Sequence, residues 1–462
     1  MSHSDSDTSI YPLLPSERTW SAGKITVMWM ITGVATWCYI IGEYIGYYLP
    51  FVSGAIAFIA GSFIGGAILL LAAIPISMRY GIDTIMSAVP QFGTRGRYLA
   101  IFFSYLVLVG WNSILIVFFG KSITQLINIT GVTLPIDTSL IAPLATIFII
   151  LLIFSFLIHG LLRFYLIAFI SGTVIVISSL WMFWVLWRDQ HQAILAAAPL
   201  YSSSNWQWNY ITVIELGIAM CLSWWPYSSA ITRKAPRASY AVMPIFLAVA
   251  VFTPIISLLG LAAVLVTGSS DPLGWLVSIG GTTYGLVAIL FVIFANIGTA
   301  AIGVYAAALS LRSLPWLNTQ PWILVLMLAM MPMIMICLLI PDLFYTHFGT
   351  FAAFLGVAFA PICGIQITDY FVLRRGKVKV RALYNYASQS DYYYWFGFNP
   401  AMILALLAGY AVYIYLLNPL TFVSHMPYEW TTASIPTALI AGLVYYGITR
   451  LWIIPAGHGG YQ

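Results

Sequence analysis

The amino-acid sequence predicts an all-α integral membrane protein with 12 transmembrane helices, and two observations carry this prediction. Of the 462 residues, 61% are hydrophobic and only 7% are charged, whereas about 25% of the residues of a soluble domain are charged. A helix needs about 20 predominantly apolar residues to cross the hydrocarbon core of a bilayer. Runs of roughly this length cover residues 25–50, 53–77, 99–120, 140–158, 164–187, 208–232, 242–267, 280–310, 321–340, 347–373, 399–418 and 430–452. The composition excludes an ordinary soluble enzyme and a disordered chain.

The positions of the basic residues set the expected orientation. Cytosolic loops of membrane proteins are enriched in Lys and Arg. With a cytosolic N-terminus and 12 spans, 16 of the 18 Lys and Arg residues fall on the cytosolic side, and only Lys121 and Arg188 do not. We therefore expect a multi-pass protein of the cell (inner) membrane with both termini in the cytosol. The net charge of +5 is spread over short loops, so no nucleic-acid partner is expected.

The same pattern divides the chain into four parts. Residues 1–24 are polar and are expected to form a cytosolic tail and not a cleaved signal peptide. Residues 25–373 are expected to form a ten-helix transport core, and residues 374–397 a basic and aromatic cytosolic loop with no assigned role. Residues 398–462 are expected to form two accessory helices and a C-terminal tail.

Two of the predicted spans contain helix-breaking residues at corresponding places. Span one contains Gly33, Gly42 and Gly46, and span six contains Pro226, which removes a backbone donor. Interrupted spans at matching positions in two halves point to a transporter site between the halves. Because spans one and six are five apart, residues 25–187 and 208–373 are expected to form inverted repeats, although no residue-level repeat is visible. The alternative is that Pro226 is only a packing kink.

Two carboxylates lie inside apolar runs. Glu43 follows the predicted break in span one by about two turns, and Glu215 precedes the break in span six by about two turns. A charge at the bilayer centre costs about 2.5–3.5 kcal/mol on insertion scales. Both are expected at a similar depth in the outer half, as proton-coupling groups; the alternative is a position at the outer water interface.

The sequence gives no support for catalysis. It contains no phosphate-binding loop, no paired nucleophile and base, and no metal-ligand spacing. The four cysteines lie in apolar runs, where they are expected to be small buried hydrophobic residues. We expect neither an enzyme nor a cofactor.

Four segments, taken in order, resemble the nucleobase–cation symporter family, which includes cytosine, allantoin and hydantoin permeases. They are Tyr80–Thr84 with Gln91–Gly96, then Gly110–Trp111, then Ser223–Pro226 continuing to Thr232–Arg233, and finally Ala360–Arg375. The resemblance covers most of the chain. It implies a LeuT-like fold, in which ten core spans form two inverted five-span repeats and two more helices follow.

The resemblance also implies a site in which two tryptophans hold a planar heterocycle. These positions fall on Trp111 and Trp224, and flat rings stack well on indole faces. The family's polar substrate contacts fall on Ala35, Leu115 and Val304, which are non-polar here. Other side chains are therefore expected to read the edge of the ligand: Thr36, Asn112, Ser113, Glu215, Ser223 and Asn296, beside the backbone at Ala35. The alternative for the two asparagines is that they tie neighbouring helices together.

For a sodium ion, the resemblance implies carbonyl ligands at Ile31, Val34 and Ala295 and hydroxyl ligands at residues 298 and 299. Residue 299 is a threonine, but Gly298 supplies no hydroxyl. The Na⁺ site is therefore expected to be weakened, and Glu43 and Glu215 favour H⁺ over Na⁺ as the coupling cation. Phe351 and Phe354 fall where the family keeps a thin external gate; core packing is the alternative.

The sequence thus predicts a secondary symporter that imports a nucleobase or related planar heterocycle of cytosine, purine, allantoin or hydantoin type by alternating access. The expected partners are this small molecule, the coupling cation and the lipid bilayer. One alternative is the same fold carrying a vitamin precursor of hydroxymethylpyrimidine type or an amino acid. The other is a membrane receptor that transports nothing.

Overall fold

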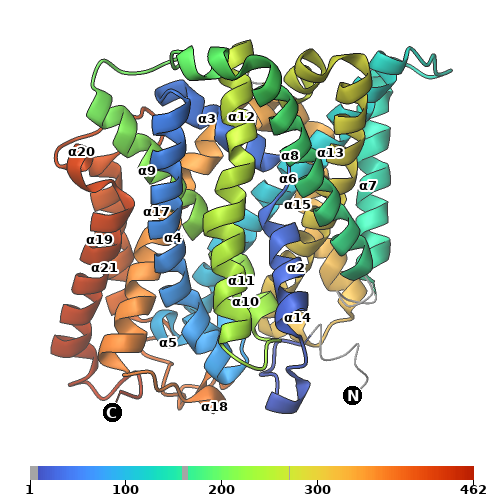
Figure 1. The fold of residues 1–462 in the computed structure, drawn as a ribbon. Helices are drawn as coiled ribbons and strands as arrows, with labels where there is room; N and C mark the ends of the chain where they lie inside the picture. Colours follow the sequence, from blue (N-terminus) through green and yellow to red (C-terminus); the bar gives the residue numbers. More distant parts are fainter. Residues whose placement is uncertain (1–8, 159–164, 270, 462) are drawn as a thin grey trace.

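The computed structural model describes residues 9–158, 165–269 and 271–461, and most of this part of the chain is helical (Figure 1). Residues 1–8 of the predicted tail, together with Arg163 among the basic loop residues, lie outside the described ranges. The elements in chain order are η1 (Pro15–Glu17), α2 (Ala22–Gly33), α3 (Trp37–Tyr48), α4 (Phe51–Tyr80), α5 (Thr84–Phe92), α6 (Arg97–Thr130), η2 (Thr138–Leu140), α7 (Ile141–Leu157), α8 (Tyr165–Ala196), α9 (Trp206–Leu222), α10 (Trp225–Thr232), α11 (Ser239–Phe246), η4 (Leu247–Phe252), α12 (Thr253–Thr267), α13 (Pro272–Arg312), α14 (Pro315–Asn318), α15 (Trp322–Leu339), α16 (Pro341–Thr346), α17 (Phe348–Ile367), η5 (Thr368–Leu373), α18 (Val380–Leu383), α19 (Pro400–Leu416), α20 (Tyr428–Thr431), α21 (Ser434–Ile448) and η6 (Thr449–Ile453).

Within the described residues, seven helical stretches are long and apolar enough to cross a membrane on their own. They are α4, α6, η2 with α7, α11 to α12, α13, α15, and α17 with η5. The pair α2 and α3 passes the same test as one span bent by 55°. The remaining four predicted spans fall on α8, on α9 with α10, on α19, and on α21 with η6. The chain is therefore a multi-pass helical membrane protein, and the count of 12 spans stays a prediction.

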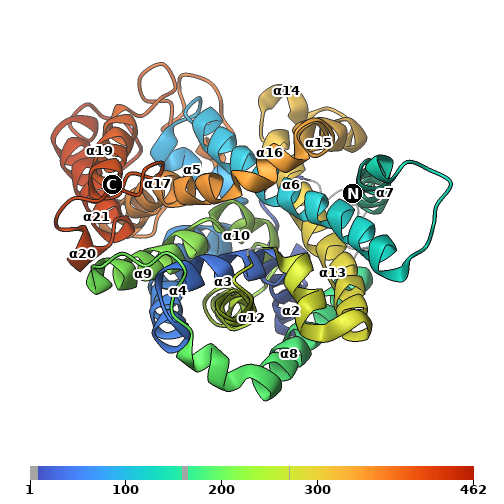
Figure 2. The same ribbon diagram turned by 90° about the horizontal axis from the view of Figure 1, so that it is seen from above.

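The two broken spans cross the middle of the molecule. In Figure 1, α2 and α10 lie in the lower half and α3 and α9 in the upper half, so the two broken spans run in opposite directions. Figure 2 shows α3, α10 and α12 near the centre, with α4, α9, α17, α6, α13 and α8 around them. The last helices, α19 and α21, lie outside this ring and pack against α17.

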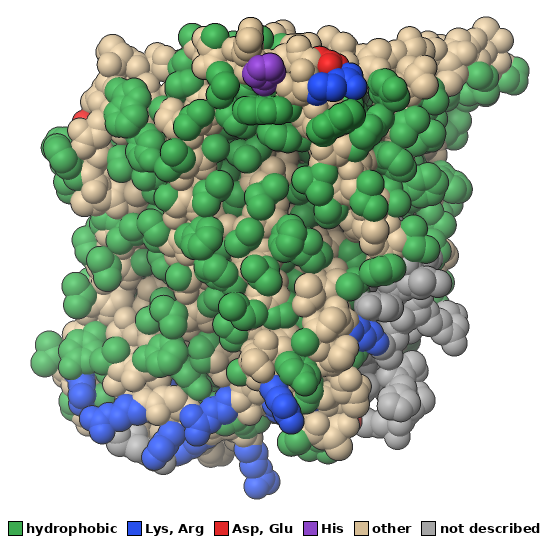
Figure 3. All heavy atoms as spheres, in the orientation of Figure 1, with side chains coloured by type: hydrophobic (Ala, Val, Ile, Leu, Met, Phe, Trp, Pro, Cys, Tyr) green, Lys and Arg blue, Asp and Glu red, His purple; other side chains and the backbone are tan. Residues whose placement is uncertain are grey.

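The surface fits a bilayer. Hydrophobic side chains cover the middle of the face shown in Figure 3, and Lys and Arg side chains gather at its lower edge. The described segment before α2 and the segment after η6 both lie at this same end of the bundle (Figure 1). Large apolar side chains such as those of Leu71, Phe102, Leu151 and Leu443 are exposed, as they must be on a surface that contacts lipid tails.

Glycines allow α3 to lie directly against α12. A Cβ atom on Gly42 would collide with the carbonyl oxygen of Ser257, and one on Gly260 would collide with the carbonyl oxygen of Tyr39. Small residues at helix interfaces let backbones approach closely, which is how helices gain packing energy in a membrane. This contact holds α3, the second half of the first broken span, in place.

We therefore predict that Gly42→Ala and Gly260→Ala each lower the thermal unfolding midpoint of the detergent-solubilised protein. Overpacking a close interface costs about 1–3 kcal/mol, more than the ~0.5–1 kcal/mol that an alanine gains over glycine inside a helix. The matched control is Gly447→Ala in α21, where a new Cβ meets nothing within 4 Å. Equal midpoints for all three variants would contradict this account of the interface.

Candidate functional site

The two helix breaks supply the backbone of the site. Residues Val34 to Thr36 separate α2 from α3, and Ser223 and Trp224 separate α9 from α10. Pro226 stands in the first turn of α10, where its missing N–H costs no helical hydrogen bond. The Ser223 hydroxyl donates to the Met220 carbonyl oxygen at 2.6 Å. The sequence placed both breaks correctly, but Ser223, expected to bind the ligand, bonds its own helix here.

Carbonyl groups freed by the first break find side-chain donors. The Thr253 hydroxyl on α12 donates to the Gly33 carbonyl oxygen, and the Thr299 hydroxyl on α13 donates to that of Ile31 at 2.8 Å. Backbone groups cannot stay unpaired at membrane depth, because no water is present to bond them. The break is therefore built into the fold by hydroxyls that come from other helices.

A cluster of aromatic rings lies between the two breaks. Trp111 on α6 and Trp224 at the second break are both 6% exposed. The ring centroid of Trp37 on α3 lies 5.1 Å from that of Trp111 and 5.6 Å from that of Trp224. Trp29 on α2 is 6.2 Å from Trp224. The two tryptophans expected to hold the ligand thus belong to one cluster, and both touch a third ring, that of Trp37.

Sequence reasoning missed Trp37 as a member of this cluster. It is the first residue of α3 and is 2% exposed. The available signal was its position: an indole directly after the break in span one corresponds to Trp224 at the break in span six. Phe348, which was also missed, packs its ring 5.3 Å from Trp111.

Several buried polar atoms beside these rings have no hydrogen-bond partner. They are Nε1 of Trp29, Nε1 of Trp224, Oδ1 of Asn112 and Nδ2 of Asn296. A buried polar atom without a partner costs about 1–3 kcal/mol, and orphaned groups of this kind are rare in folded proteins. Residues in this cluster or next to it thus hold three unpartnered donors and one unpartnered acceptor.

The second amide atom of each asparagine side chain, Nδ2 of Asn112 and Oδ1 of Asn296, forms a hydrogen bond. Asn112 donates through Nδ2 to the Leu108 carbonyl oxygen of its own helix at 2.5 Å. Asn296 on α13 accepts at Oδ1 from the Thr36 hydroxyl at 2.8 Å, which ties α13 to the first break. Thr36 therefore positions Asn296. The side chain of Ser113 is buried, with its hydroxyl unpartnered.

The three non-polar replacements are all buried. Ala35 and Val304 are 0% exposed and Leu115 is 2% exposed. None of them can donate or accept through its side chain, so the polar contacts of a ligand must come from the neighbouring groups described above.

Of the predicted sodium ligands, the structure joins Ile31 and Thr299 through the hydrogen bond already described. Val34 lies in the break itself, with extended backbone at φ −127° and ψ 111°. Ala295 and Gly298 both lie within α13, the helix that carries Thr299. Among the described residues no group of three or more His, Cys, Asp or Glu side chains could hold a metal ion.

The two intramembrane carboxylates have separate partners. Glu43, 3% exposed, accepts from Nε1 of Trp275 on α13 at 2.8 Å. Glu215 accepts four hydrogen bonds, from the hydroxyls of Tyr413 and Ser434 and from the backbone N–H groups of Ala433 and Ser434. Glu215 thus fastens α9 to α19 and to the start of α21, and both of its oxygens are engaged.

The two phenylalanines of the predicted gate differ in position. The Phe351 ring lies 6.2 Å from that of Trp111 and packs over Gly110. Phe354 is 41% exposed. The face of α17 that meets the tryptophan cluster is therefore made by Phe348 and Phe351.

The C-terminal ends of α10 and α17 are both held by hydrogen bonds. Arg233, after α10, donates to the carbonyl oxygen of Ser9, so the segment before α2 covers this end. Asp369, after α17, pairs with Arg374 at 2.7 Å, and both side chains are essentially unexposed. Tyr461 near the C-terminus donates to the same carboxylate.

This arrangement is that of a membrane transporter. The fold is similar to that of Mhp1, a nucleobase-cation-symport-1 family transporter, in a closed conformation with bromovinylhydantoin bound. The TM-score is 0.76 at 17% identity, and the match covers 96% of this chain and 95% of that one. A substrate-bound outward-open Na⁺-coupled sialic acid symporter gives a TM-score of 0.64 at 12% identity, over 94% and 90% of the two chains.

The sequence gives the family. The profile of the family described as permease for cytosine/purines, uracil, thiamine, allantoin matches residues 12–430, so the chain belongs to this family of membrane transporters. The transporter aclS of Aspergillus oryzae (strain ATCC 42149 / RIB 40) is 26% identical over 118 residues, which is 25% of this chain and 19% of that protein. The purine-uracil permease NCS1 of Arabidopsis thaliana is 29% identical over 123 residues, 26% of this chain and 19% of that protein. The chain thus covers about a fifth of the length of either relative.

The partners of Glu215 predict a structural role for it. Glu215→Ala leaves two hydroxyls and two backbone N–H groups without their acceptor, so we expect the free energy of unfolding to fall by about 1–3 kcal/mol. The measurement is the unfolding midpoint of the purified protein. Asp342→Ala is the matched control, because Asp342 is an exposed carboxylate bound only to Lys121 and surface pairs contribute little. A midpoint unchanged by Glu215→Ala would contradict the role.

Proposed function

We propose that this chain is a secondary active symporter that imports an uncharged planar heterocycle of nucleobase, allantoin or hydantoin type. We further propose that it lies in the cell (inner) membrane with both termini in the cytosol. The observation that carries the proposal is the aromatic cluster at the two helix breaks, with unpartnered polar atoms at its edge. Stacking holds the faces of such a ring and the orphaned N–H and C=O groups read its edge.

We propose that the ligand takes the place of the Trp37 ring between Trp111 and Trp224. The indole of Trp37 contacts both of the other rings, at interplanar angles of 63° to Trp111 and 55° to Trp224, and so fills the space between them. Trp37 directly follows the break, where few helical hydrogen bonds oppose a change of backbone angle. Exchange of one ring for another keeps the site filled while the ligand gains the orphaned hydrogen bonds.

The amino-acid alternative is less well supported. Bound amino acids present a carboxylate to backbone N–H groups at a helix break. The unpartnered groups described above are indole and amide side chains, which suit a neutral ring edge. A vitamin precursor with a pyrimidine ring fits the same cluster and is one outcome of the binding test below.

We propose that H⁺ is the coupling cation and that Glu43 carries it. Glu43 stands on the outer half of the first broken span, which is the part that alternating access must move, and it is buried. Glu215 is engaged by four donors, and Gly298 removes one sodium ligand. Intramembrane carboxylates of this kind are the groups that relay protons in transporters.

The binding test uses Trp111→Ala and Trp224→Ala. Stacking on one indole contributes about 0.5–1.5 kcal/mol beyond buried area, and 1.4 kcal/mol is a factor of ten, so each variant is expected to raise Kd about tenfold or more. Kd is measured by thermal shift of the purified protein with cytosine, adenine, uracil, allantoin and a hydroxymethylpyrimidine. Trp111→Phe and Trp224→Phe serve as controls that keep an aromatic face. Binding that is unaffected in both alanine variants would contradict the site.

In the same series, Trp37→Ala has the opposite expected effect. If the ligand must displace this ring, its removal lowers the cost of opening the site, and two-ring purines gain more than one-ring pyrimidines. We expect the ratio of Kd for cytosine to Kd for adenine to rise about tenfold. A loss of affinity for every base would show instead that Trp37 is a fixed wall of the site.

The coupling test uses two sets of proteoliposomes: empty ones to measure accumulation, and ones loaded with unlabelled base to measure exchange. We expect an inwardly directed proton gradient to drive accumulation of the labelled base, and Glu43→Gln to abolish accumulation while exchange of internal for external base continues. The comparison distinguishes a role of Glu43 in proton coupling from a role in substrate binding, because exchange needs binding and movement but no net proton transfer. Accumulation that follows a sodium gradient and ignores the proton gradient would refute this assignment.

A further inference from the structure

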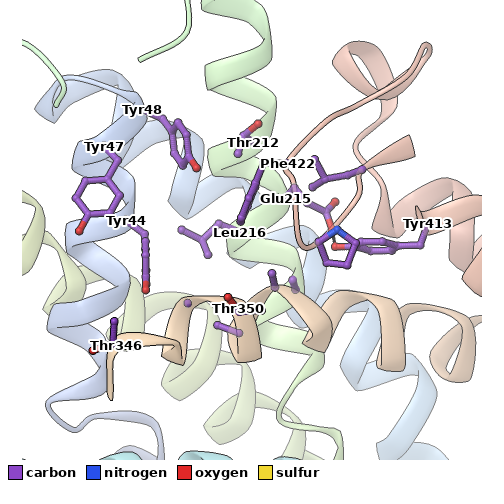
Figure 4. Close-up of a pocket in the computed structure, with 16 residues that line it drawn as sticks. Tyr44, Tyr47, Tyr48, Thr212, Glu215, Leu216, Thr346, Thr350, Tyr413 and Phe422 are labelled. Carbon is purple, nitrogen blue, oxygen red and sulfur yellow. Dashed lines mark hydrogen bonds between the residues drawn. The ribbon is translucent and has the colours of Figure 1, made fainter. Parts of the chain in front are cut away.

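We infer that the chain holds a second binding site for the same class of uncharged planar heterocycle, in a cavity on the other side of α17 from the tryptophan cluster; this inference rests on the proposed function. The cavity has a volume of about 330 Å³, within the range of ligand pockets. It is formed by α3, α9, α17 and α19, with the loop after α19 (Figure 4). Of the helices that form it, α3 and α9 lie in the half of the molecule away from the described C-terminal segment (Figure 1).

The walls of the cavity suit a flat ring with polar edges. Tyr44 and Tyr48 stand one helical turn apart on α3, while Thr346 ends α16 and Thr350 lies in the first turn of α17 (Figure 4). The tyrosines thus supply ring faces and hydroxyls, and the threonines supply further hydroxyls. This set can stack a heterocycle and bond its edge, as the inner cluster does with indoles and amides.

The tyrosine rings are held by their neighbours. The Tyr44 ring lies 5.4 Å from that of Tyr47 in an edge contact, and the Tyr48 ring lies 5.6 Å from that of Trp208 in another. Tyr47 in turn meets Tyr201 at 5.2 Å. Rings fixed in this way lose little further freedom when a ligand stacks on them, which favours binding.

The charge state of the lining excludes a cationic or anionic ligand. Glu215 is the one carboxylate among the described lining residues, and these include no Lys, Arg or His. Both oxygens of Glu215 already accept hydrogen bonds from α19 and α21, as described above. The carboxylate is therefore committed to the fold, and no free charge faces the cavity to pair with an amine or a carboxylate.

One helix separates this cavity from the inner cluster. Phe348 and Phe351 on one face of α17 pack against Trp111. Gly349, Thr350 and Ala353, on another face of the same turns, line the cavity. An α-helix is about 10 Å thick with its side chains, and these residues are small. A heterocycle in the cavity would thus be separated from Trp111 by one helix, and a movement of α17 would connect the cavity with the tryptophan cluster.

The test titrates the purified full-length protein with radiolabelled cytosine, adenine, uracil and allantoin as separate probes and counts the molecules bound with wild-type affinity. We expect two molecules of the accepted base per chain in the wild type. Trp224→Ala, which raises Kd at the inner site, is expected to keep one molecule bound with wild-type affinity. Ala353→Phe, which adds a ring to the cavity wall, is expected to keep the other. The control Ala198→Phe makes the same substitution at an exposed position in the loop between α8 and α9 and should still bind two.

The outcomes separate the two proposals. A wild-type stoichiometry of one that Trp224→Ala abolishes and Ala353→Phe preserves would overturn the second site and leave the proposed function standing. A stoichiometry of one that survives Trp224→Ala but not Ala353→Phe would support the cavity and overturn the inner site. If the wild type binds none of the four probes, the proposed function and the inference that rests on it both fail. Unfolding midpoints of each variant show whether a loss reflects misfolding.

Discussion

The structure depends on one constraint, which is that a helix broken inside a membrane must find partners for every backbone group it frees. The break between α2 and α3 meets this constraint with hydroxyls from two other helices, Thr253 on α12 and Thr299 on α13. These hydrogen bonds connect the first broken span to the helices around it. They also leave a short, non-helical stretch of chain at the centre of the bundle, beside the second break, where side chains can gather around a ligand.

The aromatic cluster lies at this non-helical stretch of chain. Trp29 and Trp37 come from the two sides of the first break and Trp224 from the second, while Trp111 comes from an unbroken helix. A site shared in this way changes shape whenever the two spans move relative to each other. The same rings can therefore bind substrate and respond to the movement that alternating access requires. Helix α17 contacts this cluster on one face and lines the cavity beside Tyr44 on another, so one element touches both places.

The sequence predicted the fold well because its strongest signals are local. Runs of apolar residues, the proline in span six and the glycines in span one each act within a few residues, and the structure places the breaks at Val34–Thr36 and Ser223–Trp224 as expected. Contacts between distant segments were harder to predict. Nothing near Glu215 in the chain indicates that its partners are Tyr413 and Ser434, about 200 positions away.

Trp37 shows the same limit within the site. Family resemblance identified positions 111 and 224 by their motifs, but the ring that touches both comes from a third helix and belongs to no motif used. Its direction depends on the 55° bend between α2 and α3, a three-dimensional quantity. The polar atoms left without partners, such as Nδ2 of Asn296, are likewise visible only once the helices are packed.

The most direct test of this account is an experimental structure of the protein with a brominated base that it binds, such as 5-bromouracil or 8-bromoadenine, with bromine located by its anomalous signal. The account predicts a flat ring between Trp111 and Trp224, bonded to Asn112 or Asn296, with the Trp37 indole moved out of that space. A base bound with Trp37 still packed against both rings, or bound away from the two helix breaks, would contradict it.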